Sequence, residues 1–153
     1  MIEKHLEGDQ FRYWALISYS HADAKWGDWL HTALETYRVP TRLVRRAQPK
    51  GAVPRRIFPV FRDREELASS SSLSENIEKA LRLSRALVVI CSPRSANSTW
   101  VNEEVKVYKS MGREDRVFCL IMDGEPNAPA GSGMAECFPQ ICPFPVGPRW
   151  WNL

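Results

Sequence analysis

The sequence lacks the segments that lead a chain into or through a membrane. No run of 18 apolar residues occurs among its 153 residues, although a membrane-spanning helix needs that length. The first ten residues, MIEKHLEGDQ, are polar and contain no signal-peptide core. The cysteines form no C-x-x-C pair, so a zinc site is not expected; they are Cys91, Cys119, Cys137 and Cys142. We therefore expect a cytoplasmic protein with no bound metal and no membrane contact.

The glycine-rich loops that hold phosphate groups are also missing. No G-x-G-x-x-G occurs, because Gly131 and Gly133 are followed by Glu136, and no G-x-x-x-x-G-K occurs. Ser18 and Tyr19 stand where a phosphoacceptor receiver would have clustered acids for magnesium. These absences argue against a bound dinucleotide cofactor, a P-loop and a receiver domain.

The composition is that of one ordinary folded domain. With 44% hydrophobic and 25% charged residues, the chain has enough apolar surface to build a core. Its net charge of +3 is too small to indicate nucleic-acid binding without a concentrated basic face. We expect no nucleic-acid partner.

Apolar runs of strand length alternate with segments of helical periodicity. This alternation predicts an open parallel α/β sheet with helices on both faces. The purely apolar run at 86–91 should be central, and Pro59 should confine its own run to a sheet edge. The expected strands are 13–19, 57–61, 86–91 and 117–122, and the expected helices lie within 23–37, 73–81 and 98–108. Residues 93–98 are expected to form a polar turn.

The segment 38–56 is a long basic connector without a clear period. It holds three prolines and no acid, and its seven cations are Arg38, Arg42, Arg45, Arg46, Lys50, Arg55 and Arg56. Such a charge run is either a solvated loop or a surface that holds an anionic ligand or partner. The sequence leaves both interpretations open.

Three polar segments follow the expected strands, at 18–21, 62–66 and 92–104. In open α/β sheets ligands bind in the crevice outside the carboxyl ends of the strands. These three segments are therefore the candidate walls of one site.

The same segments resemble the sequence boxes of the Toll/interleukin receptor (TIR) domain family. FRYWALISYSHAD is similar to the first box, FRDREELASSSSLSENIEKAL to the second box and its BB loop, and ALVVICSPRSANSTWVNEEV to the W-x-x-x-E region of enzymatically active members. The resemblance covers residues 11–123 and implies a flavodoxin-like TIR domain there. Residues 124–153 then form an irregular, proline-rich tail in which the family's last strand and helix are missing or atypical, as expected of a truncated or frame-altered end of the domain.

The resemblance implies cleavage of the nicotinamide–ribose bond of NAD⁺, with NAD⁺ as substrate and no cofactor. Glu104 then takes the position of the family's catalytic glutamate, four residues after Trp100 and on the same helix face. The substrate-binding residues implied with it are Tyr19, Ser20, Arg62, Asp63 and Trp100. The products are nicotinamide and either ADP-ribose or a cyclic isomer.

The resemblance also implies a rival function, a non-enzymatic adaptor in signal transduction. Either type of TIR domain associates with other TIR domains through the BB loop, here about residues 62–73. The enzyme would act in bacterial defence or virulence.

The residues alone allow plainer interpretations of each candidate. Trp100 could be a packing residue, and Glu104 with Glu103 could form an exposed pair at a helix N-terminus. Tyr19 could simply end a buried strand. Arg62 and Asp63 could belong to a local ion pair that braces the BB loop.

Overall fold

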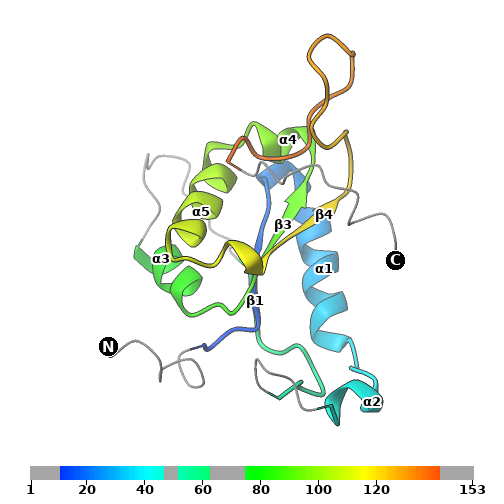
Figure 1. Ribbon diagram of the computed structural model, residues 1–153, viewed down its shortest axis with the longest axis vertical. Coiled ribbons are helices and arrows are strands. Elements are labelled where there is room, and N and C mark those ends of the chain that lie inside the picture. Colours follow the sequence, from blue (N-terminus) through cyan, green and yellow to red (C-terminus); the bar gives the residue numbers. More distant parts are fainter. Residues whose placement is uncertain (1–10, 47–51, 63–74, 142–153) are drawn as a thin grey trace.

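The protein forms an open, fully parallel sheet with helices on both faces (Figure 1). The computed structural model describes residues 11–46, 52–62 and 75–141. Within them the strand order is β2-β1-β3-β4, so β3 is interior and β2 lies at an edge, both as predicted. The strands are β1 (Ala15–Ser18), β2 (Val60–Arg62), β3 (Leu87–Cys91) and β4 (Val117–Ile121).

Helix α1 covers one face of the sheet, and α3 and α5 cover the other (Figure 1). Side chains alternate along β1: Leu16 packs toward α3 and α5, whereas Ala15 and Ile17 pack toward α1. The helical elements are η1 (His21–Asp23), α1 (Ala24–Thr36), α2 (Thr41–Val44), α3 (Glu75–Arg82), α4 (Pro93–Ala96), α5 (Thr99–Ser110) and η2 (Glu114–Arg116). None of these is long and apolar enough to span a bilayer.

The edge strand β2 begins later than the apolar run predicted. Pro59 has no N–H to donate, and only its carbonyl joins the neighbouring backbone, accepting a hydrogen bond of 2.9 Å from the Trp14 N–H. The ladder with β1 therefore starts at Val60, which pairs with Ala15.

The prediction of a simple turn at 93–98 is wrong, because these residues contain the single-turn helix α4. Ser92 and Ser95 cap it reciprocally: the Ser92 hydroxyl accepts from the Ser95 N–H, and the Ser95 hydroxyl accepts from the Ser92 N–H. Ser98 then caps α5 by accepting from the Val101 N–H at 3.3 Å. Two short caps thus set the start of the helix that carries Trp100.

Residues 122–141, the described part of the chain after β4, contain neither helix nor strand. They still pack on the domain. Cys137 is fully buried in the core beside α5, with Phe138 and Ile141 against the same cluster. The Lys109 ammonium donates to the Ile141 carbonyl at 2.8 Å, which ties this segment to the end of α5.

Candidate functional site

A pocket of about 480 Å³ opens where β1 and β2 end, between α1 and the first turns of α5. This volume lies in the range of small-molecule and cofactor sites. Four residues predicted from the sequence meet there: Tyr19, Arg62, Trp100 and Glu104. The complete lining is Ile17, Tyr19, His21, Ala24, Asp28, His31, Thr32, Arg62, Trp100 and Glu104.

Glu104 is the buried carboxylate of this pocket. The residue is only 2% exposed, so the interpretation of Glu104 as half of an exposed acidic pair is wrong. The Ser18 hydroxyl at the end of β1 donates a short hydrogen bond to Glu104 Oε2. Burying a carboxylate is costly unless hydrogen bonds compensate for the lost water. The hydrogen bond from Ser18 therefore orients the Glu104 carboxyl group in the pocket.

Trp100 lies one helical turn before Glu104 and both packs and lines the pocket. Its indole contacts the core cluster formed by α3, α5 and the sheet, and it also contributes to the pocket wall. Trp100 is thus a packing residue that also lines the pocket, and its substrate-binding role stays a prediction. An aromatic surface and a carboxylate face the same space.

Tyr19 reaches the pocket because α1 has a glycine opposite its ring. A β-carbon at Gly27 would stand only 2.8 Å from Tyr19 Cε1 and 2.9 Å from Cζ, closer than such contacts occur. Gly27 is itself buried, near the N-terminus of α1. The absent side chain gives the ring its place on the pocket wall.

Arg62 forms an ion pair with Asp28 of α1 across the pocket. The Arg62 side chain is 7% exposed, whereas that of Asp28 is 65% exposed. Because Arg62 ends β2 and Asp28 lies on α1, this ion pair joins the strand to the helix. Asp63, Arg64 and the rest of the expected BB loop through residue 73 lie outside the described residues.

The start of β2 is also attached to α1. His31 Nε2 lies 3.0 Å from the Val60 carbonyl, which accepts its proton, and the Val60 N–H donates to Glu35 Oε1 at 2.9 Å. One helix therefore holds both ends of the short edge strand that ends in Arg62.

Ser20 is not among the pocket-lining residues. It is 7% exposed and stands at the N-terminus of η1, where its carbonyl accepts from the Asp23 N–H at 2.8 Å. The serine that contacts Glu104 is Ser18, which the sequence did not single out. Asp28, His31 and Thr32 were also missed; their i, i+3, i+4 spacing marks a polar stripe on α1 that could have been found.

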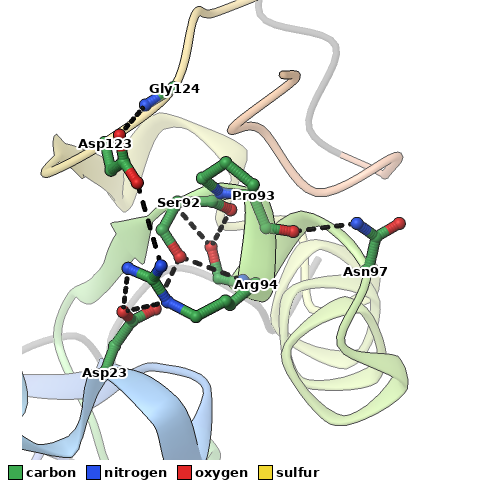
Figure 2. A network of polar contacts seen from close by, with 8 residues as sticks. Asp23, Ser92, Pro93, Arg94, Asn97, Asp123 and Gly124 are labelled. Atoms are coloured by element: carbon green, nitrogen blue, oxygen red, sulfur yellow. Dashed lines mark hydrogen bonds and ion pairs between the residues drawn. The ribbon is translucent and has the colours of Figure 1, made fainter.

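A buried carboxylate joins the two walls of the pocket (Figure 2). Asp23, 1% exposed, accepts from the Ser92 hydroxyl at 2.5 Å and from Arg94 Nε at 2.8 Å and Nη2 at 2.7 Å. Arg94 also lies 3.8 Å from Asp123. Because Asp23 precedes α1 and Ser92 and Arg94 begin α4, this network fixes the α1 wall relative to the segment leading to Trp100.

Comparisons with known proteins show the family of the chain. The family model for the TIR domain matches residues 16–138. The chain is 36% identical over 115 residues to the NAD(+) hydrolase ApTIR of Actinoplanes sp.; the match covers 74% of this chain but only 14% of that protein. Among solved structures, the TIR domains of the activated Roq1 resistosome, which directly recognises the pathogen effector XopQ, align with a TM-score of 0.44 and 24% identity over 72% of this chain and 57% of the other.

Proposed function

The chain belongs to the TIR domain family, and on that premise we propose that it is an NAD⁺ nucleosidase that cleaves the nicotinamide–ribose bond. The observation that carries the proposal is the buried Glu104 carboxylate on the pocket wall beside Trp100. The relative named as an NAD(+) hydrolase supports the same chemistry, although the chain spans about one seventh of that protein.

In this proposal Glu104 stabilises the charge that develops on the ribose. Breaking the bond between C1′ and the nicotinamide nitrogen passes through an oxocarbenium-like state. A fixed carboxylate beside C1′ stabilises that cation more than it stabilises the substrate. Ser18 holds the carboxylate in place, so little reorientation is needed during the reaction.

The bond electrons leave with nicotinamide, which departs as a neutral base and needs no strong acid. Water then adds to C1′ and releases one proton, giving ADP-ribose. Attack by a nucleophile of the adenosine part would instead give a cyclic isomer. Both outcomes require the same first bond cleavage, so Glu104 has the same role in each.

The remaining lining residues suit the rest of the dinucleotide. Trp100 and Tyr19 offer aromatic surfaces for the rings, and the Arg62 guanidinium offers a positive charge for the diphosphate. Asp28 keeps Arg62 paired while no substrate is present. In this proposal the chain acts in the cytoplasm and associates with other TIR domains through the segment at about 62–73.

The test is the release of free nicotinamide from NAD⁺ by concentrated protein, free and clustered on beads. Glu104→Gln should abolish release, while the matched variant Glu103→Gln, at the partly exposed neighbour that does not line the pocket, retains it. Equal release by Glu104→Gln and the parent would refute the role of Glu104. If the parent releases no nicotinamide even when clustered, the enzyme proposal fails and the adaptor function stands.

A further inference from the structure

The basic connector folds into a separate lobe at the end of the molecule away from the pocket. We call the described residues 37–46 and 52–58 the basic lobe. It follows the C-terminus of α1 and precedes β2, so it adjoins the amino ends of the strands, and Figure 1 shows it around α2 at the lower end of the molecule. The pocket opens at the opposite, carboxyl ends.

The lobe concentrates positive charge without compensating acids. No Asp or Glu occurs between residues 37 and 58. Six arginines of the lobe are exposed, and none forms an ion pair with any residue that the structure describes; they are Arg38, Arg42, Arg45, Arg46, Arg55 and Arg56. The net charge of the whole chain is only +3, so the lobe is far more basic than the remaining surface.

Two of these arginines stand directly opposite each other. Arg38 and Arg56 form an antiparallel bridge, and the Val39 N–H donates to the Arg55 carbonyl at 3.0 Å. This bond joins the neighbours of the two bridged residues, so Arg38 and Arg56 themselves form a non-hydrogen-bonded pair. In such a pair the two side chains stand closer together than in a hydrogen-bonded pair. Like charges in that position destabilise the pair. A bound anion would remove this repulsion.

Apolar side chains are exposed on the same lobe. Tyr37 is 50% exposed, Leu43 is 37% exposed and Phe58 is 60% exposed. Arginine side chains interspersed with exposed aromatic and aliphatic side chains are typical of surfaces that lie in the headgroup region of a bilayer.

We propose that the basic lobe binds the surface of a membrane that contains anionic phospholipids. Arginine forks pair with lipid phosphates, and Leu43 and Phe58 enter the boundary between headgroups and acyl chains. Leu43 favours a bilayer over a single-stranded nucleic acid, because an aliphatic side chain offers no ring on which bases stack. The lobe also projects from the molecule, as contact with a flat surface requires.

This proposal revises the expectation of no membrane contact, which rested on the lack of long apolar runs. Attachment to a membrane surface needs no such run. It is independent of the proposed enzymatic function, because the lobe shares no residue with the pocket.

The test is co-sedimentation of the full chain with vesicles of phosphatidylcholine alone and of phosphatidylcholine mixed with phosphatidylglycerol. Binding is expected only to the mixed vesicles and should weaken as salt is raised. Each arginine near the surface contributes about fivefold in affinity, so Arg38→Gln with Arg56→Gln should weaken binding about 25-fold. The matched control, Lys79→Gln with Arg82→Gln on α3, removes the same charge and should change binding little.

A second variant pair tests the apolar part of the surface. Leu43→Ser with Phe58→Ser keeps the charge and should still weaken binding to mixed vesicles. Thermal unfolding of each variant shows whether it is folded. Binding to phosphatidylcholine alone, no binding to either vesicle, or tighter binding to a single-stranded oligonucleotide than to mixed vesicles would each overturn the proposal.

Discussion

Ser18 donates a hydrogen bond to Glu104 across 86 positions of sequence, joining the end of β1 to the second turn of α5. Both residues are buried, at 1% and 2% exposure. The position of the carboxylate therefore depends on the packing of α5 against the sheet. A change at Ser18 acts on the pocket through Glu104 without replacing a residue that lines it.

Ser18→Ala should lower kcat for nicotinamide release about tenfold, because one hydrogen bond that orients the carboxylate is lost. KM should change less, since Ser18 does not line the pocket. Steady-state kinetics with NAD⁺ measure both. Ser110→Ala, which removes an exposed hydroxyl from the same helix α5, is the control. An unchanged kcat in Ser18→Ala would contradict a positioning role.

Gly27→Ala should displace the Tyr19 ring from the pocket wall, because the new methyl group would stand within 3 Å of it. KM for NAD⁺ should rise, and the protein should be destabilised although alanine favours helix by about 1 kcal/mol. In a Tyr19→Ala background the clash is gone, so Gly27→Ala should stabilise the protein. Urea unfolding of the four proteins measures this change of sign, and additive effects would exclude the contact.

Arg94→Ala should lower the free energy of unfolding by about 1–3 kcal/mol, because the buried Asp23 carboxylate keeps only the Ser92 hydroxyl among its side-chain donors in the network. Adding Asp23→Asn removes the uncompensated charge and should recover part of the loss. Arg82→Ala breaks an exposed pair with Glu78 and should cost under about 1 kcal/mol. Equal costs for the two arginines, measured in urea, would contradict a special role for the network.

Cys137 should make the fold sensitive to alkaline pH. Burial, aided by the charge of Glu136, raises the pKa of this thiol from 9.0 to about 11. Above pH 9 the folded protein therefore retains a proton that the unfolded chain loses. The contribution of the buried neutral thiol to the free energy of unfolding is complete below pH 9 and declines above it. Between pH 9 and 11 the free energy of unfolding should fall by about 1.4 kcal/mol per unit.

Urea unfolding at pH 8, 9 and 10 checks this slope against Cys137→Ala, which should be less sensitive over the same interval. The pH range of this test ends at 10 because of Tyr108, whose pKa burial raises from 10.0. Above pH 10 the neutral Tyr108 hydroxyl also contributes less to the free energy of unfolding, which would add to the slope from Cys137. A slope that is the same in both proteins would assign the alkaline sensitivity to other groups.

Strands β3 and β4 were predictable because each lies in a continuous apolar run. The runs at 86–91 and 117–122 differ from β3 and β4 by one residue at a single end. At β2 the apolar run predicted a start that is too early, because Phe58 is apolar but exposed and the ladder starts only after Pro59. Hydrophobicity alone does not show that a proline shifts the first hydrogen bond of the ladder to a later residue.

The part of the candidate site that lies on a single helix was predictable. The i, i+4 spacing of Trp100 and Glu104 places both on one side of α5 whatever the remaining fold. The choice between Ser18 and Ser20 depends on where β1 ends: the strand stops at Ser18, and the chain turns into η1 before the alternation could continue. The contact of Asp28 with Arg62 requires knowing how closely α1 packs on β2, which no local pattern specifies.

The attachment of Val60 to His31 and Glu35 has an evolutionary consequence. Helix α1 and strand β1 both bind β2, and both come before Arg62 in the sequence. Residues earlier in the chain therefore fix the position of Arg62. Mutations beyond Arg62 leave these anchors intact. A chain whose sequence changes after β2 therefore keeps the contacts that position the pocket-lining Arg62 guanidinium.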